Sequence, residues 1–488
     1  MSKTVQTLDI ERRVGFSIPV LSQTLPPVNG LSVAVVGGGF AGLMSAFALR
    51  SLGFSVTVFE ARSEVGGRVR SRTDISKGRM IELGGELIGA NHPVWLYYAR
   101  SLGLGLSVLT SDNQFSGAGL QKPLYIHGHA ITGGEVDHLN RGRRRVLEKI
   151  SADAQAIVDP YEPWNSPRAP EWDSKSVSEM LQVHGVDHGS VLWDALAMSI
   201  VNNQAVPLKQ QSYLGLLAGV RGGALDGDPG AFWTQSDAYR CAAGNQQLAH
   251  LFRARLVDAD VTSVRTCTPV TMLEIASNGV TVGTSTDSFQ ADFAVLAIPQ
   301  PTWKQLQIFP SIPGSYMIST GPAVKYLSPL ASRFWLADGL SPSGSSDELG
   351  ITWEGTDNQM ISNDQEIELT AFAGGSWAEM ALSAPDKTAY FTPRLEAMFH
   401  GRYEQHLAAP AVFVPWPEEK WTQCGYSCPA PGEVMSAAPL LADLYESRLA
   451  FAGEHTVMAM CGYMEGALQS GLLAAGRILK AAERRHFR

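Results

Sequence analysis

One stretch near the N-terminus, residues 31–60, constrains the fold of this chain most strongly. It reads LSVAVVGGGFAGLMSAFALRSLGFSVTVFE, in which an apolar, β-branched run precedes three glycines. Gly37, Gly39 and Gly42 have the spacing G-x-G-x-x-G, and a helix-like segment and a second strand that ends at Glu60 follow them. This order of strand, glycine-rich turn, helix, strand and acidic residue predicts a Rossmann-like α/β unit that binds a dinucleotide.

The glycines and the acid have separate roles in such a unit. Gly37 permits the tight turn, Gly39 lets the backbone approach a pyrophosphate at the helix N-terminus, and Gly42 lets the helix pack on the strand. Glycine-rich turns also occur for packing reasons alone, but here every element stands at the required offset. Glu60 is placed to bind ribose hydroxyls, which favours FAD or NAD over NADP.

The residues that follow this unit distinguish FAD from NAD. Residues 60–68 read EARSEVGGR. This run resembles the FAD-binding opening of the flavin amine oxidases, a superfamily that includes monoamine oxidases, polyamine oxidases and L-amino acid oxidases. Gly66 and Gly67 would let the backbone pass close to the cofactor, and the guanidinium of Arg68 can grip a diphosphate, although it could also be a solvated surface charge. The resemblance therefore implies FAD.

Further segments resemble the same family. Residues 82–86 (ELGGE) resemble the segment whose glycine pair lies against the flavin ring, and residues 451–456 (FAGEHT) and 462–471 (GYMEGALQSG) resemble the closing motif, where an acid takes a ribityl hydroxyl. Val270 matches a valine whose backbone contacts the adenine end. The resemblance implies the following cofactor-binding residues: Gly37, Gly39, Ala41, Gly42, Glu60, Ala61, Arg62, Gly67, Arg68, Gly84, Gly85, Glu86, Val270, Gly453, Glu454, Gly462, Tyr463 and Met464.

Matches at both ends of the chain indicate that it leaves its first domain and returns to it. With 488 residues, 45% of them apolar, the chain can bury a large core and form two or more structural domains. We expect an α/β protein in which a Rossmann-like FAD-binding domain is interleaved with an α+β substrate-binding domain, the amine oxidase-like two-domain fold. The expected segments are 1–29 for an N-terminal arm, 30–91, 237–300 and 425–488 for the FAD-binding domain, and 92–236 and 301–424 for the substrate-binding domain.

Three residues are candidates for catalysis. Residues 321–326 (GPAVKY) resemble the family strand whose lysine holds a water against flavin N5, which would give Lys325 this role; the alternative is a strand lysine that points to solvent. Residues 421–432 resemble the segment that carries one wall of the monoamine oxidase aromatic cage, at Tyr426, and Tyr463 matches the other wall. Two opposed tyrosines would orient a neutral amine, with core packing as the alternative for either ring.

Two departures from the family pattern bear on cofactor and substrate. Animal monoamine oxidases carry a cysteine that bonds to the flavin just before the cage tyrosine, but this chain has Gly425 there and Cys424 one position earlier, which predicts noncovalent FAD. The arginine that binds the carboxylate in many L-amino acid oxidases would fall near Glu86 or Leu87, which favours amines as substrates. A carboxylate-binding arginine could still come from elsewhere, for example Arg221.

The resemblance implies an oxidase that deaminates a primary or secondary amine, with hydride transfer to flavin N5 and production of hydrogen peroxide from molecular oxygen. The alternatives are an L-amino acid oxidase for aromatic or bulky side chains and a non-catalytic flavin-binding protein. Family resemblance also allows a homodimer. Four aromatic residues are candidates for substrate contact and equally for the core: Trp193, Phe232, Trp233 and Trp353.

Composition excludes several other classes. The net charge of −9 argues against nucleic-acid binding, which needs clustered cations. The sequence contains neither a signal-peptide core nor an apolar run long enough for a membrane span, so we expect a soluble, cytoplasmic protein. The five cysteines are odd in number and scattered, which suits reduced thiols. Cys424 and Cys428 lack a second ligand pair, and we expect no metal.

Overall fold

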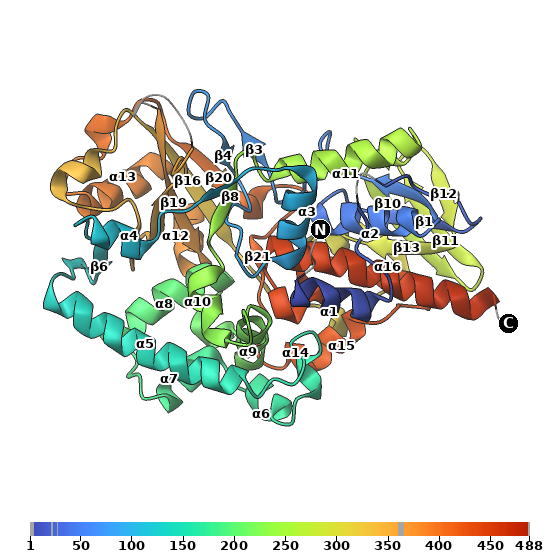
Figure 1. Ribbon diagram of the computed structural model, residues 1–488, viewed down its shortest axis with the longest axis horizontal. Helices are drawn as coiled ribbons and strands as arrows, with labels where there is room; N and C mark the ends of the chain where they lie inside the picture. The colour runs from blue at the N-terminus through green and yellow to red at the C-terminus, as the bar shows by residue number, and fades with distance from the viewer. Residues whose placement is uncertain (1–3, 21–22, 27, 360–365, 487–488) are drawn as a thin grey trace.

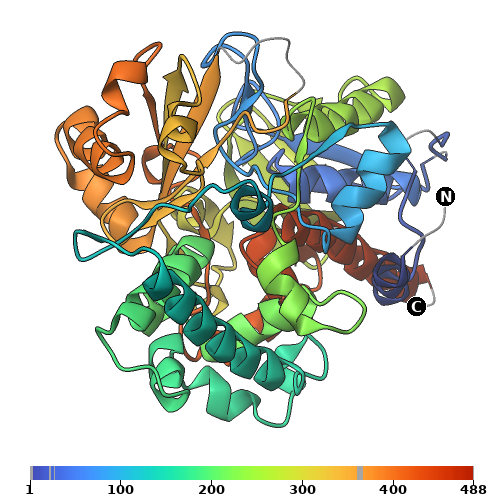
Figure 2. The ribbon, with the colours of Figure 1, turned by 60° about the vertical axis from the view of Figure 1, so that its left-hand side comes forward.

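The computed structural model describes residues 4–20, 23–26, 28–359 and 366–486. Its elements form two halves (Figure 1). One half is built around a parallel sheet and the N-terminal and C-terminal helices, and the other around a large, mainly antiparallel sheet with a layer of helices beneath it (Figure 2). Both halves contain segments from distant parts of the sequence, which confirms the predicted interleaved α/β architecture.

The first sheet has five strands that all run parallel, in the order β22-β13-β1-β2-β9. Its strands are nearly continuous apolar runs because both faces of the sheet are covered. They come from three separate parts of the chain: β1 (Ser32–Val36), β2 (Ser55–Phe59), β9 (Val264–Arg265), β13 (Phe293–Leu296) and β22 (Leu449–Phe451).

Helices cover one face of this sheet. Helix α2 (Phe40–Ser51) packs between α11 (Gln246–Ala259) and the long C-terminal helix α16 (Met464–His486). The contact between α2 and α16 is close at Gly471, where an added Cβ would lie 2.6 Å from the carbonyl oxygen of Ala41. Because Gly471 has no side chain, α16 can pack against α2 at this short backbone distance.

The other face of the parallel sheet carries a four-stranded sheet, in the order β12-β11-β10-β14. Its inner side shares one apolar cluster with the parallel sheet, in which Val36 and Phe59 meet Leu273 and Val282. A hairpin turn at Asn278-Gly279 joins two of its strands. The strands are β10 (Val270–Ala276), β11 (Gly279–Thr284), β12 (Ser288–Ala291) and β14 (Gln307–Phe309).

The second half is built on a seven-stranded sheet, in the order β20-β16-β19-β18-β17-β6-β7. Its inner strand β16 is buried along its whole length, because the sheet is covered on both faces. The strands are β6 (Leu124–Ile126), β7 (His129–Ala130), β16 (Ala323–Leu330), β17 (Gly344–Ser346), β18 (Gly350–Glu354), β19 (Ile367–Gly374) and β20 (Val412–Pro415). The helices that complete this half include α5 (Gly134–Ala154), α8 (Val191–Gln204), α9 (Tyr213–Gly222), α12 (Gly375–Ser383) and α13 (Lys387–Met398).

Two segments lie differently from the expected division of the chain. Helix α1 (Val5–Val14), within the segment expected as an arm, is capped by Thr4 and packs against α16. Helix α3 (Pro93–Leu102), expected in the substrate-binding part, shares the apolar core of α2 and α16 instead. Glu465 of α16 caps α3 by accepting the N–H groups of its first residues at 2.9 and 3.0 Å. Both helices therefore pack with the parallel-sheet half.

Candidate functional site

One cavity lies between the two halves. The carboxyl ends of β1, β2, β13 and β22 open into it from one side, where ligands bind in sheets of this kind, and β16, β18 and β19 line it from the other. Every residue predicted from the sequence as catalytic or cofactor-binding, apart from Gly42, lines this cavity: Gly37, Gly39, Ala41, Glu60, Ala61, Arg62, Gly67, Arg68, Gly84, Gly85, Glu86, Val270, Lys325, Tyr426, Gly453, Glu454, Gly462, Tyr463 and Met464.

Gly42 has the packing role that the motif predicts. A Cβ at this position would lie 1.9 Å from the carbonyl oxygen of Gly37, so any side chain would push α2 away from the turn after β1. Gly37 itself has φ +108, a conformation that favours glycine. Gly37 therefore allows the conformation of the turn after β1, and Gly42 allows α2 to pack directly against that turn.

Two helix N-termini face the cavity. Helix α2 begins after Gly39 and α16 begins at Met464, and both residues line the cavity. The free N–H groups and partial positive charge at such ends suit an anion. Gly39 and Gly67 approach so closely that a Cβ on Gly67 would lie 3.2 Å from the Cα of Gly39, which leaves bare backbone for a diphosphate.

The acid at the end of β2 is held by the backbone. Glu60 accepts hydrogen bonds from the N–H of Gly38 at 2.7 Å and from the N–H of Arg62 at 2.8 Å, one on each carboxylate oxygen. A carboxylate has about four acceptor positions, so two remain for other donors. The side chain is thus fixed in the cavity wall with the capacity to accept ribose hydroxyls.

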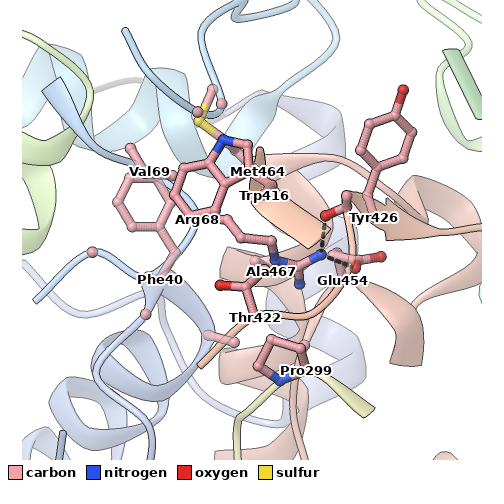
Figure 3. Close-up of a pocket in the computed structure, with 18 of the residues that line it drawn as sticks. Phe40, Arg68, Val69, Pro299, Trp416, Thr422, Tyr426, Glu454, Met464 and Ala467 are labelled. Carbon is pink, nitrogen blue, oxygen red and sulfur yellow. Dashed lines mark hydrogen bonds and ion pairs between the residues drawn. The ribbon is translucent and has the colours of Figure 1, made fainter. Parts of the chain in front are cut away.

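Arg68 and Glu454 contact each other across the cavity wall (Figure 3). Arg68 Nη1 donates to Glu454 Oε1 at 2.8 Å and to the carbonyl oxygen of Gly425 at 2.9 Å. Burial alone would raise the pKa of Glu454, but the charge of Arg68 and the N–H of Gly462 outweigh it and lower that pKa. The sequence predicted two separate cofactor contacts, whereas the structure joins them in one ion pair.

His455 is a cavity residue that the sequence analysis did not single out. It follows Glu454, is 1% exposed and lines the cavity. Its Nε2 has no hydrogen-bond partner among the described residues, and burial lowers its pKa to about 4, so the ring is neutral at pH 7. A neutral ring with an unpartnered nitrogen suits a polar ligand atom, so the cavity fits FAD in this respect as well. The position of His455 inside the FAGEHT motif was the sequence signal that could have identified it.

Lys325 takes part in a buried ionic network. Its Nζ donates to Glu86 Oε2 at 2.6 Å and to the carbonyl oxygen of Glu82 at 2.9 Å, and it lies 5.5 Å from the ring centre of Trp353. Glu86 Oε1 accepts from Arg240 Nε at 2.8 Å and from Trp353 Nε1 at 2.9 Å. Burial would raise the pKa of Glu86, but the two cations lower it. An ammonium has three donors, so one remains on Lys325 for a water in the cavity.

The two predicted cage tyrosines line the same cavity. The hydroxyl of Tyr426 donates to the carbonyl oxygen of Asn202, which fixes the ring from the α8 side. The ring of Tyr463 stands edge-on to His92 and Phe232, with ring centres 5.6 and 6.2 Å apart. Burial raises the pKa of both hydroxyls, so both remain neutral.

Other candidates from the sequence lie elsewhere. Of the four aromatic candidates for substrate contact, only Trp353 lines the cavity, and the other three belong to the core beneath the second sheet or pack against it: Trp193, Phe232 and Trp233. Arg221, on α9, does not line the cavity.

The thiol nearest the cage does not reach the cavity either. Gly425 lines the cavity, whereas Cys424 is 2% exposed and lies outside its lining. Burial raises the pKa of this thiol to about 11, so it is a poor nucleophile. The cavity lining therefore supports noncovalent cofactor binding.

Sequence analysis also overlooked Trp416 and Asp237. Trp416 Nε1 donates to the carbonyl oxygen of Leu83 at 2.8 Å, and the ring closes the cavity beside Gly84 (Figure 3). Asp237 is open to the cavity. Neither residue belongs to a recognisable motif, so only the folded structure reveals them.

The described residues form neither a metal-binding cluster nor a membrane-spanning helix. Within residues 4–20, 23–26, 28–359 and 366–486, no three side chains of His, Cys, Asp or Glu gather so that they could hold a metal ion. No helix in those same ranges combines the length and the apolar character needed to cross a bilayer.

Comparisons with known proteins agree with this geometry. The chain is 24% identical over 476 residues to the probable flavin-containing monoamine oxidase A of Dictyostelium discoideum. This alignment covers 91% of this chain and 97% of the relative. Wild-type putrescine oxidase bound to putrescine has a similar fold, with a TM-score of 0.78 and 21% identity over 93% of this chain and 99% of that one. So does cyclohexylamine oxidase from Brevibacterium oxydans IH-35A, with a TM-score of 0.77 and 22% identity over 93% of this chain and 100% of that one. The family model for flavin containing amine oxidoreductases matches residues 40–479, and the chain therefore belongs to this family of FAD-dependent oxidoreductases.

Proposed function

We propose that this protein is an oxidase that converts a small primary or secondary amine to its imine and reduces oxygen to hydrogen peroxide. The observation that carries the proposal is the charge of the cavity. Each arginine or lysine in the cavity lining of the described chain is paired with a glutamate: Arg62 with Glu419, Arg68 with Glu454 and Lys325 with Glu86. The cavity thus offers aromatic walls but no free cation for a substrate carboxylate.

The redox chemistry would come from FAD, which when bound accepts a hydride equivalent at flavin N5 and passes two electrons to oxygen. The C–H bond next to an amine is too weakly acidic for an ordinary side-chain base, so orientation and a dry pocket are the main contributions of the protein. Tyr426 and Tyr463 would hold the neutral amine between their rings. Lys325 would order a water with its remaining donor.

The residues proposed to hold FAD are those whose geometry suits each part of it. Glu60 and Val270 would contact the adenosine end, and the N-terminus of α2 with Arg68 would contact the diphosphate. Glu454 and the N-terminus of α16 would face the ribityl chain and the ring system. The name of the Dictyostelium relative supports an amine as the substrate class.

An L-amino acid oxidase is the second candidate. Arg240 gives it some support, because its Nη1 has no hydrogen-bond partner among the described residues. That nitrogen is buried, however, and Arg240 does not line the cavity. An amino acid would therefore need a movement of the cavity wall before its carboxylate could be bound.

Anaerobic reduction of the bound flavin by matched pairs tests the proposal. The pairs are tryptamine against L-tryptophan and phenethylamine against L-phenylalanine. Loss of flavin absorbance with the amines alone is the expected result. Loss with the amino acids alone would replace the proposal by the second candidate, and a flavin that no amine or amino acid reduces would indicate a non-catalytic flavoprotein.

A further inference from the structure

The hydroxyl of Tyr426 is held by the end of a helix. Helix α8 ends at Gln204, and the hydroxyl donates to the carbonyl oxygen of Asn202 in its last turn. The last four carbonyl groups of a helix have no partner within it and carry a partial negative charge, so they readily accept such a donor. Figure 3 shows the ring of Tyr426 extending away from the ion pair of Arg68 and Glu454, with the hydroxyl at its far end. The position of the ring therefore depends on where α8 ends.

The side chain of Asn202 fixes this last turn. Its Nδ2 donates to the carbonyl oxygen of Met198, one turn earlier, at 2.6 Å, and its Oδ1 accepts from the N–H of Gly374 at 3.2 Å. Gly374 is the last residue of β19, so the side chain joins the helix to the second sheet. Any residue at position 202 offers a carbonyl oxygen to Tyr426, but only a side chain with both a donor and an acceptor can make the two other bonds. The amide of Asn202 therefore controls where its own carbonyl lies.

Three glycines contact the same helix end. A Cβ on Gly321 would lie 1.8 Å from the carbonyl oxygen of Ala205. Cβ atoms on Gly374 and Gly375 would lie 3.1 and 2.8 Å from atoms of Val201. Ala205 is buried and has φ +56, a left-handed conformation that glycine usually takes at the end of a helix. Such a conformation persists only where the surrounding packing fixes it, so the end of α8 has one defined position.

One of these glycines also holds the backbone of the cage tyrosine. Gly321 pairs with Tyr426 between β15 (Thr320–Gly321) and β21 (Tyr426–Ser427), and its carbonyl oxygen accepts from the N–H of Gly425 at 2.8 Å. The backbone of Tyr426 and the helix end that accepts its hydroxyl thus contact the same glycine. A side chain that is held at both ends cannot leave its rotamer without breaking one of these contacts.

We propose that Asn202 is a positioning residue for amine oxidation, because its side chain places the carbonyl that holds Tyr426 in the cage. This inference rests on the proposed amine oxidase function and adds a residue to it. The amine must present the C–H bond next to its nitrogen to flavin N5, and small displacements from that orientation lower the rate strongly. A loosened Tyr426 should therefore lower the limiting rate of flavin reduction more than it weakens amine binding, since the other cavity walls remain.

A double-mutant cycle tests the proposal. Anaerobic stopped-flow reduction by phenethylamine compares the wild-type holoenzyme with Asn202→Ala, Tyr426→Phe and the double variant. Each single substitution should lower the limiting rate about 2- to 10-fold, as expected for the loss of one hydrogen bond, with a smaller change in the dissociation constant. The double variant should be no slower than Tyr426→Phe, because Asn202 acts through the hydroxyl that phenylalanine lacks. Losses that multiply in the double variant, or an unchanged rate in Asn202→Ala, would overturn the inference.

Gln204→Ala is the matched control. It removes a carboxamide from the same helical turn, but within the described part of the chain the side chain of Gln204 has no hydrogen bond, and it does not line the cavity. This variant should reduce its flavin at the wild-type rate. Asn202→Ser keeps a hydroxyl that can replace one of the two amide bonds, so its rate should lie between those of the wild type and Asn202→Ala. The serine variant takes the place of Asn202→Ala in the cycle if the alanine variant does not bind FAD.

A spectrum separates failure of this inference from failure of the proposed function. Visible circular dichroism of the bound flavin responds to the aromatic rings around it and requires no turnover. Asn202→Ala and Tyr426→Phe should change this spectrum in the same way, and Gln204→Ala should not change it. Absence of reduction by any amine would refute the oxidase function and leave this spectral test in force. An unchanged spectrum in Asn202→Ala would refute the positioning role, even in an enzyme that oxidises amines.

Discussion

Glu86 and Lys325, which lie 239 residues apart in the sequence, form a buried ion pair with 2.6 Å between Oε2 and Nζ. Their side chains are 4% and 5% exposed. The pair joins the two halves of the protein at the cavity, because Glu86 follows the first nucleotide-binding segments and Lys325 belongs to the second sheet. Substitutions at either residue therefore test both stability and chemistry.

Lys325→Met should slow reduction or reoxidation of the flavin while FAD stays bound. The substitution removes the remaining ammonium donor, and Glu86 keeps its bond to Arg240. We expect a loss of about tenfold or more in one half-reaction, because a hydrogen bond from a charged group to the ordered water is worth roughly 1.5 kcal/mol or more. Stopped-flow measurement of each half-reaction, with flavin content determined in parallel, decides the matter, and unchanged rates would remove the assigned role.

Glu86→Gln should destabilise the fold strongly. It leaves the charges of Lys325 and Arg240 buried without an anion, which typically costs about 3–5 kcal/mol. The measurement is urea unfolding of both proteins with excess FAD. The control is Glu171→Gln, which breaks an exposed ion pair with Arg168 and should not change the unfolding midpoint measurably. Similar midpoints for all three proteins would contradict the network's role.

His455→Ala should weaken FAD binding. It removes an unpartnered ring nitrogen from the cavity wall, and one hydrogen bond is worth about 0.5–1.5 kcal/mol, or roughly 2- to 13-fold in the dissociation constant. Fluorescence titration of the apoprotein with FAD measures the change. His455→Gln retains a donor and should recover part of the affinity; equal affinity in all three proteins would mean that the ring only fills space.

Sequence patterns predicted the parts of the site that depend on local backbone geometry. The turn at Gly37, the packing glycine Gly42 and the acid at Glu60 follow from spacing within one strand–helix–strand unit, and the structure places them as that spacing requires. Resemblance to the family selected Lys325 and Tyr463 as site residues, and both line the same cavity in the structure. Local rules succeed here because each of these segments positions its own residues.

Partners that come from distant segments could not be predicted in this way. Arg68 was expected to contact only the cofactor, yet it pairs with Glu454, 386 residues later. Arg240 and Asp237 are three residues apart, but Arg240 bonds to Glu86 without lining the cavity itself, whereas Asp237 lines it. Nothing in their spacing separates these outcomes, because the direction of each side chain is set by elements that pack around the loop.

The order of strands in the parallel sheet has a consequence for biosynthesis. Strand β22 forms an edge of that sheet, and the N-terminus of α16 completes the cavity wall, yet both belong to the last tenth of the chain. A nascent polypeptide emerging from the ribosome presents its glycine-rich turn long before these closing pieces exist. The cavity therefore cannot enclose a cofactor until residues 449–486 have been synthesised and have packed onto segments made about 400 residues earlier.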